Sequence, residues 1–429
     1  MNDSTQTIRP ATGMNGSVRL PGDKSISHRY AILAALARGT TRMENYSTAA
    51  DCASTLRCVE QLGCGVRRDG GSIVIDGRAG ALVQPSSPLD CGNSGSTMRM
   101  LAGVLAAQPF ASEMIGDESL SRRPMRRIVE PLLQMGARVE AGAGDRPPLR
   151  ITGSKLHAID YSTPIASAQV KSCVLLAGLH AEGETSVTEP VRTRDHTEIA
   201  LRAFGVEVER RQNRVSIRGG QSLTGLEAYV PGDISTATFF LCAASIFPGS
   251  RLIFDNVLLN PTRALILDIM AGMGLQISFL RVEEQHGELI GTIQVESSPV
   301  RGTRISGAAT AALIDELPAL AALAPYTETG IEIRDARELR VKESDRIAAV
   351  SENLRRMGAR VEEFEDGLRV AGQQRLHGAE LESYGDHRVA MAFSVAALGA
   401  EGESQMNGAD AVAVSFPEFY PTMESLIER

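Results

Sequence analysis

A unit that repeats six times along the 429 residues constrains this chain more than any other feature. Each copy opens with a small, polar and charged turn, continues into an Ala/Leu-rich apolar run, and passes through a Gly/Pro break into a short strand-like stretch. Such a period means that one supersecondary unit is used repeatedly. The copies begin at Gly22-Asp23-Lys24-Ser25, Gly92-Asn93-Ser94-Gly95, Ser167-Ala168-Gln169, Gly232-Asp233-Ile234-Ser235, Ile314-Asp315-Glu316 and Gly385-Asp386-His387-Arg388.

A second sub-motif follows the first five copies, and it consists of a helix-like stretch that ends in glycine and then a strand-like run. We therefore predict an α/β fold of helix–strand units, arranged as two domains of three units each, with a soft boundary between residues 220 and 235. The glycines are Gly63, Gly136, Gly205, Gly274 and Gly358, and the runs are 72–76, 149–152, 215–218, 292–295 and 367–370.

Residues 344–357 illustrate the helical part of the sub-motif. Their apolar positions step by three, four and three residues, which is helical spacing. We predict Ser344 as the N-cap and Gly358 as the C-terminal stop of this helix. The apolar positions are Ile347, Val350, Leu354 and Met357.

The charge pattern indicates a small anionic ligand. A net charge of −8, no Trp and 4% aromatic residues argue against broad nucleic-acid binding, which needs a basic surface and often stacking rings. Arg and Lys nevertheless gather in particular turns, and locally basic turns in an acidic chain favour a focused anion pocket.

Composition also excludes several other classes. The longest uncharged apolar stretch, near residues 239–247, is too short to span a bilayer, and the N-terminus lacks the pattern of a signal peptide. The six cysteines have no Cys-x-x-Cys spacing, so we expect neither a zinc site nor a redox dithiol, and no other cofactor. Reduced thiols in a cytoplasm are the expected state.

The charged residues lie in or near the first turns of the predicted helices. Helix N-termini bind anions because their N–H groups are unsatisfied and the dipole end is positive. The densest such turn, residues 21–29, carries Lys24, Ser25 and Arg29. It is not a P-loop, because Asp23 stands directly before Lys24 where that motif has glycine.

Each basic turn alone could be a solvated helix end, and the charge run 342–346 could be exposed, with local ion pairs worth little. Arg122-Arg123 could likewise belong to a surface turn, and Asp315-Glu316 could only favour the helix dipole. Because the basic turns occupy equivalent positions in the repeats, a shared functional role is the stronger interpretation.

Nine ordered motifs resemble the 5-enolpyruvylshikimate-3-phosphate synthase family, and they cover nearly the whole chain. The resemblance implies two domains of three repeats each, with helices inside and sheets outside. It places residues 1–21 plus 232–429 in a C-terminal domain and 22–231 in an N-terminal domain, with the active site in the cleft between them. The motifs are LPGDKSISHR (20–29), GNSGSTMR (92–99), RRPM (122–125), SAQVKSCVLLAGL (167–179), TRDHTE (193–198), PGDISTATFF (231–240), IDELPALA (314–321), RVKESDR (340–346) and GDHRVAMA (385–392).

The resemblance implies transfer of the enolpyruvyl group of phosphoenolpyruvate to the 5-hydroxyl of shikimate 3-phosphate, by a monomeric enzyme of aromatic amino-acid biosynthesis that is the target of glyphosate. Both substrates are polyanions, which suits Arg because its fork binds carboxylate or phosphate bidentately. The expected shikimate 3-phosphate site is Lys24, Ser25, Arg29, Ser167, Gln169, Arg194, Asp315 and Lys342. The expected phosphoenolpyruvate site is Lys24, Gly95, Arg123, Gln169, Arg346 and Arg388.

The implied chemistry needs a base for the 5-hydroxyl and an acid for the methylene C3 of phosphoenolpyruvate. Asp315 is the candidate to orient and deprotonate the hydroxyl. Glu343 is the candidate acid, with Lys24 as another proton donor, and the sequence does not assign the two proton transfers among these three residues.

Some positions depart from the pattern of other family members. Glu338 stands where some members carry Asn, and Val414 and Ser415 precede Phe416-Pro417 where some carry Lys. Ala168 replaces a second Ser, and Arg194 matches one branch of the family. These departures bear on affinity more than on reaction type.

Two alternatives compete with this interpretation. The sister enolpyruvyl transferase that acts on UDP-N-acetylglucosamine shares the fold but uses a flexible loop with a reactive Cys, whereas Cys91 and Cys173 stand at or inside predicted helices. A non-catalytic repeat scaffold would explain the period but not the charged residues. An assay with both expected substrates and phosphate detection separates the three.

Overall fold

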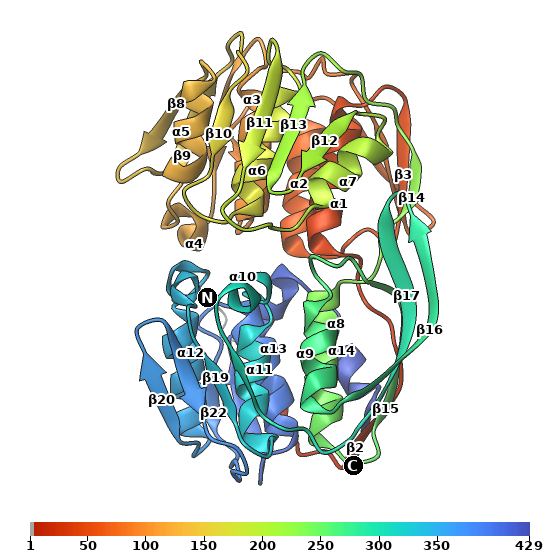
Figure 1. The fold of residues 1–429 in the computed structure, drawn as a ribbon, viewed down its shortest axis with the longest axis vertical. Helices are drawn as coiled ribbons and strands as arrows, with labels where there is room; N and C mark the ends of the chain where they lie inside the picture. Colours follow the sequence, from red (N-terminus) through yellow and green to blue (C-terminus); the bar gives the residue numbers. More distant parts are fainter. Residues whose placement is uncertain (1–3) are drawn as a thin grey trace. The chain divides into compact units, whose positions relative to one another are not determined.

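The computed structural model describes residues 4–429, and the chain divides into two compact units. The N-terminal unit is Gly22–Val230 with Glu284–Glu288, and the C-terminal unit is Met1–Pro21, Pro231–Glu283 and Leu289–Arg429. Each unit contains three sheets with helices packed against them (Figure 1). The mixed α/β architecture of helix–strand units confirms the predicted fold class.

Three four-stranded sheets form the outer layer of the N-terminal unit, in the orders β14-β3-β5-β4, β6-β7-β9-β8 and β10-β11-β13-β12. In each sheet the first two strands are parallel and the other neighbours are antiparallel. The strands are β3 (Thr40–Glu44), β4 (Gly65–Asp69), β5 (Ser72–Asp76), β6 (Leu89–Asp90), β7 (Ala111–Ile115), β8 (Arg138–Gly142), β9 (Arg146–Thr152), β10 (Asp160–Ser162), β11 (Glu184–Thr188), β12 (Val208–Arg211), β13 (Arg214–Arg218) and β14 (Glu227–Tyr229).

The core of this unit consists of the first helix of each repeat: α1 (Lys24–Leu36), α3 (Gly95–Leu105) and α6 (Ala168–Gly178). These helices are apolar almost all round, which is the pattern of buried helices, and their charged residues lie in the first two turns. The α1 helix, for example, is buried from Ile26 to Leu36. The other helices are α2 (Ala50–Gln61), α4 (Glu118–Ser121), α5 (Arg126–Gln134) and α7 (His196–Ala203).

The C-terminal unit has the same plan, with buried helices α8 (Ile234–Ile246), α11 (Leu317–Leu323) and α13 (His387–Leu398). Its sheets have the orders β16-β17-β15-β2-β24, β18-β19-β21-β20 and β1-β23-β22. The strands are β1 (Thr5–Ile8), β2 (Gly13–Val18), β15 (Arg251–Leu258), β16 (Gln276–Gln285), β17 (Glu288–Glu296), β18 (Thr303–Ile305), β19 (Ile331–Ile333), β20 (Val361–Phe364), β21 (Gly367–Val370), β22 (Glu380–Glu382), β23 (Ser404–Asn407) and β24 (Ile427–Glu428).

The remaining helices of the C-terminal unit are short or amphipathic. They are α9 (Leu265–Met273), α10 (Ala308–Ala312), α12 (Arg346–Arg356) and α14 (Phe419–Glu424), with 3-10 helices η1 (Ala324–Tyr326), η2 (Arg337–Val341) and η3 (Ala409–Val414). No helix in residues 4–429 has the length and apolar character needed to cross a membrane.

The glycines of the second sub-motif end α2, α5, α7, α9 and α12, as predicted. All have positive φ, from +87° to +116°, a conformation that glycine adopts without the Cβ clash of other residues. The five predicted strand-like runs lie within β5, β9, β13, β17 and β21.

The predicted N-cap of α12 is wrong. The helix begins at Arg346, and the carboxylate of Asp345 accepts the N–H of Ala348 at 3.0 Å. Ser344 lies one residue too early to cap, and its hydroxyl instead donates to Oδ2 of Asp386 at 3.1 Å.

Candidate active site

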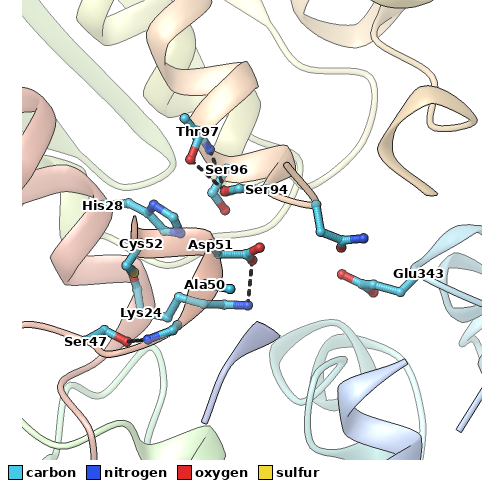
Figure 2. A network of polar contacts seen from close by, with 12 residues as sticks. Lys24, His28, Ser47, Ala50, Asp51, Cys52, Ser94, Ser96, Thr97 and Glu343 are labelled. Carbon is cyan, nitrogen blue, oxygen red and sulfur yellow. Dashed lines mark hydrogen bonds and ion pairs between the residues drawn. The ribbon is translucent and has the colours of Figure 1, made fainter. Parts of the chain in front are cut away.

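The first turn of α1 presents Lys24 as its first helical residue. The N-cap Asp23 accepts the N–H of Ile26 at 2.9 Å, which satisfies one of the free donors of the helix start. The Nζ atom of Lys24 lies 3.0 Å from Oδ2 of Asp51, at the start of α2 (Figure 2). This ion pair orients the ammonium group while leaving 18% of the lysine side chain exposed.

Arg29 lies one turn further into α1 and joins three helices. Its guanidinium donates to Oγ1 of Thr197 at 2.6 Å, to Oγ of Ser172 at 2.9 Å and to the carbonyl of Ser25 at 2.8 Å. Thr197 is on α7 and Ser172 is on α6. A buried charge is costly unless it is hydrogen-bonded, and these three oxygens accept hydrogen bonds from the Arg29 guanidinium within the helix layer.

The start of α3 is tied to the start of α6 through Gln169. The Nε2 atom of Gln169 donates to Oγ of Ser96 at 2.9 Å, and Nη1 of Arg99 donates to Oε1 of Gln169 at 2.6 Å. The α3 helix itself is capped by Ser94, so Gly95 is its first residue. Gly95 and Gln169, both expected at the phosphoenolpyruvate site, therefore belong to one hydrogen-bonded group.

Arg123 belongs to the same group. It donates to Oδ1 of Asn93 at 2.8 Å and to Oγ of Ser119 at 3.1 Å. A Cβ atom added to Gly95 would lie 3.6 Å from Nη1 of Arg123, so the two expected phosphoenolpyruvate residues are in contact distance. Asn93 in turn donates to Oδ2 of Asp117 at 2.8 Å, which fixes the carbonyl that holds Arg123.

Ser167 and Arg194 complete the residues expected in the N-terminal unit. Ser167 is the N-cap of α6, and Arg194 is half-buried in the loop before α7. The preceding Thr193 donates to Glu189, and Nζ of Lys171 lies 2.9 Å from Glu189. The same ammonium lies 2.9 Å from Glu198 of α7, and all three of these charged side chains are fully buried. This buried network holds the loop that carries Arg194.

The C-terminal unit brings its expected residues into one charged cluster around Asp315. Oδ1 of Asp315 lies 3.7 Å from Nη1 of Arg346 and 3.8 Å from Nε of Arg388. Nη1 of Arg388 also donates to the main-chain carbonyl of Asp315 at 2.8 Å. Glu343 accepts from Nη2 of Arg346 at 2.7 Å. The candidate base and the candidate acid thus share one guanidinium.

Asp386 holds two arginines of this cluster through hydrogen bonds. It accepts from Nε of Arg346 at 2.7 Å and from Nη2 at 3.2 Å, and both side chains are almost completely buried. Its Oδ1 atom also accepts the N–H of Arg388 at 2.9 Å. Burial on its own would lower the pKa of Arg346, but Asp386 and Glu343 raise it above its ordinary value. Arg346 therefore remains charged, and the alternative of an exposed charge run is excluded for it.

The pKa of Lys342 is shifted in the opposite direction to that of Arg346. Burial lowers the pKa of its amine, and the attraction of Asp315 opposes that shift. Desolvation disfavours the charged form of any amine. Glu338, where the sequence departs from other family members, is exposed in η2, and Val414 ends η3.

Comparison with known proteins identifies the family. The model of EPSP synthase (3-phosphoshikimate 1-carboxyvinyltransferase) matches residues 8–423. Proteins named 3-phosphoshikimate 1-carboxyvinyltransferase from Koribacter versatilis (strain Ellin345) and Solibacter usitatus (strain Ellin6076) are 65% and 55% identical, each over 98% of this chain and 99% of its own length.

The chain belongs to the EPSP synthase family. A solved EPSP synthase from Acinetobacter baumannii has a TM-score of 0.88 and 40% identity, and the match covers 99% of this chain and 98% of that one. The family and fold expected from the nine motifs are confirmed, and with them the assignment of the chain as a transferase of the EPSP synthase type.

The motifs did not point to the residues that hold the side chains expected to bind ligand, namely Asp386, Asn93 and Asp51. Asp386 stands inside the GDHR motif, so its place before two basic residues was a usable signal. Asn93 likewise stands beside Gly95 in the GNSGSTMR motif. Asp51 had no such signal, because only the packing of α2 on α1 brings it to Lys24.

Proposed function

We propose that this chain transfers the enolpyruvyl group of phosphoenolpyruvate to the 5-hydroxyl of shikimate 3-phosphate and releases phosphate, in the shikimate pathway of aromatic amino-acid biosynthesis. The observation that carries this proposal is the cluster in which Arg346 lies against both Asp315 and Glu343. One reaction that needs a base and an acid beside an anion-binding arginine is the addition of an alcohol to phosphoenolpyruvate.

The basic residues at or near the helix starts bind the anionic groups of the substrates. The expected phosphate and carboxylate ligands are polyanions, and Arg29, Arg123 and Arg194 present guanidinium groups that bind such groups through charge-assisted hydrogen bonds. Gly95 lies beside Arg123, since a Cβ atom added to it would be 3.6 Å from Nη1 of that arginine, and without a side chain its backbone can approach a small substrate closely. We assign Lys24, Ser25, Arg29, Ser167, Gln169, Arg194, Asp315 and Lys342 to shikimate 3-phosphate, and Lys24, Gly95, Arg123, Gln169, Arg346 and Arg388 to phosphoenolpyruvate.

The chemical steps follow from the charges of the cluster. Asp315 accepts the 5-hydroxyl proton while the oxygen attacks C2 of phosphoenolpyruvate. C3 gains a proton from Glu343, or from Lys24, and a tetrahedral intermediate with a methyl group results. The methyl group then returns a proton to the group that supplied it, Glu343 or Lys24, and the C2–O bond to phosphate breaks. The departing phosphate takes up the proton held by Asp315, and the enol ether and phosphate are released. Arg346 and Arg388 stabilise the charge on phosphate and carboxylate throughout.

The assembly and location of the enzyme are part of the proposal. We propose a monomer that works in the cytoplasm, a compartment in which its six cysteines stay reduced. All six are buried free thiols. Among residues 4–429, no group of three or more His, Cys, Asp or Glu side chains could hold a metal ion.

The test is a coupled assay of the purified chain with shikimate 3-phosphate and phosphoenolpyruvate, in which phosphate release is recorded and the product is identified by NMR. We expect stoichiometric phosphate and an enolpyruvyl ether at the 5-position. Phosphate release without that ether, or no turnover, would reject the proposal.

The same assay with UDP-N-acetylglucosamine as acceptor tests the sister reaction. Burial raises the pKa of the Cys173 thiol to about 12. A hydrogen bond with Cys58 together with burial raises the pKa of Cys91 well above its usual range. The reactive thiolate needs a low pKa and access, so we expect no turnover with this acceptor.

A further inference from the structure

Two polar rungs join α1 and α2 in the N-terminal unit. Lys24 and His28 are four residues apart on α1, and Asp51 and Thr55 are four residues apart on α2, so each pair lies on one helix face. The first rung is the Lys24–Asp51 ion pair. The second is a hydrogen bond of 2.6 Å between Nδ1 of His28 and Oγ1 of Thr55. The His28 side chain belongs to the KSISHR motif, yet the proposed reaction does not use it.

The second rung continues into the first turn of α3. Oγ1 of Thr55 lies 2.6 Å from Oγ1 of Thr97, and that hydroxyl donates to Oγ of Ser94 at 2.7 Å. Figure 2 shows the Lys24–Asp51 contact and the Ser94–Thr97 contact in one view, together with His28. His28, Thr55, Thr97 and Ser94 are each fully buried. We call these four residues the polar chain.

The hydrogens of the polar chain run in one direction. Ser94 accepts both the hydroxyl and, at 3.1 Å, the amide N–H of Thr97. The oxygen of Thr97 is then left to accept from Thr55, and the oxygen of Thr55 accepts from Nδ1–H of His28. This order leaves Nε2 of His28 as the unprotonated nitrogen, and that atom is buried with no hydrogen-bond partner. A bare lone pair is the less costly group to bury, since an unsatisfied N–H loses its full hydration.

Burial, followed by the charges of Lys24 and Arg29, lowers the pKa of His28 well below its ordinary value. The polar chain requires a neutral His28 ring, because a protonated ring would add a second buried donor at Nε2. The four residues therefore form a fixed series of donors and acceptors within an otherwise apolar layer of helices.

We propose that the polar chain positions the phosphoenolpyruvate subsite, by fixing the register of the helix that carries Lys24 against the helix start that carries Gly95. Apolar contacts alone would hold α1, α2 and α3 together but would tolerate small shifts, whereas hydroxyl hydrogen bonds have narrow distance limits. The first turn of α3 also holds Gln169 through Ser96 and Arg99, so a shift there would disturb several phosphoenolpyruvate contacts. The inference rests on the proposed function for its substrate.

The first test is Thr55→Val, which removes the middle hydroxyl at almost constant volume. We expect KM for phosphoenolpyruvate to rise about tenfold, the effect of one lost buried hydrogen bond, while kcat changes little. Thr55→Ser restores the hydroxyl and should restore KM. Thr185→Val is the matched control, because Thr185 is equally buried in the same unit and its hydroxyl has no partner.

A Thr55→Val enzyme that folds and keeps the wild-type KM for phosphoenolpyruvate would overturn the proposal. So would a change that Thr185→Val reproduces. If Thr55→Val does not fold, the decision passes to His28. His28→Asn can place an N–H near the original Nδ1 and should keep KM, whereas His28→Leu cannot and should raise it, and equal KM values in the two variants would overturn the proposal.

The second measurement does not depend on activity. The ¹⁵N spectrum of the histidine-labelled protein reports which ring nitrogen of His28 carries the proton, and the signal is assigned by its loss in His28→Asn. We expect the Nδ1–H tautomer. An Nε2–H tautomer or a charged ring at neutral pH would contradict the proposed order of donors and acceptors in the polar chain. A wild-type protein without turnover would instead reject the proposed function, so the two failures are distinguishable.

Discussion

The two units hold their arginines in different ways. In the N-terminal unit, Arg29 and Arg123 donate to neutral oxygens of Ser, Thr and Asn side chains and of the main chain. In the C-terminal unit, Arg346 lies against three carboxylates, and Arg388 lies against one of them.

This difference separates two tasks. The hydrogen bonds that Arg29 and Arg123 donate to neutral oxygens orient their guanidinium groups without adding negative charge, and we expect this N-terminal set to bind phosphate and carboxylate groups. An arginine surrounded by carboxylates gives a nearly balanced cluster, which holds Asp315 and Glu343, the two carboxylates that we propose for proton transfer. Lys24, which is paired with Asp51, is the intermediate case. The following predictions test the comparison, from the largest expected effect to the smallest.

Asp315→Ala tests whether the carboxylates of the C-terminal cluster perform chemistry. We expect kcat to fall by about 10²–10⁴, the usual loss for a general acid–base group, with little change in KM for phosphoenolpyruvate, because a carboxylate does not attract that anion. Steady-state kinetics with both substrates varied measures this. Asp268→Ala, at an exposed carboxylate on α9, is the control. Near-wild-type turnover of Asp315→Ala would leave Glu343 and Lys24 to carry the proton transfers.

Asp386→Ala tests the dependence of Arg346 on its buried partner. Removing one member of a buried ion pair typically costs about 3–5 kcal/mol, because the other charge stays buried and uncompensated. Asp315 and Glu343 remain beside Arg346 in this variant, so we expect a loss near the lower end of that range in the free energy of unfolding, measured by urea titration. Asp117→Ala removes an exposed N-cap carboxylate and should cost only about 1 kcal/mol. Equal losses in the two variants would contradict the buried pair.

Arg123→Ala tests the N-terminal set as a binding device. The loss of a charge-assisted hydrogen bond is worth about 1.5–3 kcal/mol, so KM for phosphoenolpyruvate should rise about 10–100-fold with a smaller change in kcat. Arg122→Ala is the control, because this exposed neighbour pairs with Glu118 on the surface. A fall in kcat alone would indicate that Arg123 acts in the chemical step and not in binding, and it would contradict the proposed division of tasks between the two units.

Gly95→Ala tests the space beside Arg123. The added methyl carbon would lie 2.9 Å from Nη1 of Arg99, so that guanidinium must move to admit it. We expect the substitution to weaken the binding of the longer anion glyphosate more than that of phosphoenolpyruvate. The ratio of the glyphosate inhibition constant to KM should rise about tenfold. Gly272→Ala, on α9 with open space around its Cβ position, should change neither. Equal weakening of both ligands would argue against Gly95 at this subsite.

The pH dependence of shikimate 3-phosphate binding tests Lys342. Because burial lowers the pKa of its amine, the charge is present at low pH and is lost as pH rises, earlier than for an exposed lysine. We expect the affinity to fall a few-fold in the alkaline range, measured by titration calorimetry. Lys342→Arg should abolish that fall, and Lys155→Arg, at an exposed lysine, should keep it. An alkaline fall that persists in Lys342→Arg would assign it to another group.

Local sequence patterns predicted much of the fold and the family of this protein. The six-fold repeat predicted the α/β class, and the glycine endings predicted five helix ends, because both depend on residues close together in the chain. The motifs identified the family and named the residues now proposed for the site. The cap of α12 was misassigned by one residue, since Ser and Asp are both good N-caps and adjacent in sequence.

The partner of each charged side chain depends on contacts between residues far apart in the chain. Arg346 and Asp386 are 40 residues apart, and Arg29 and Thr197 are 168 apart. The polar chain joins helices from two repeats in the same manner. Such partners depend on how helices from different repeats pack, and the hydrogen bonds involved tolerate only a few tenths of an ångström. The motifs set the kinds of charge at each helix start, and the packing of the helices set which side chains hold those charges, as Asp386 holds Arg346.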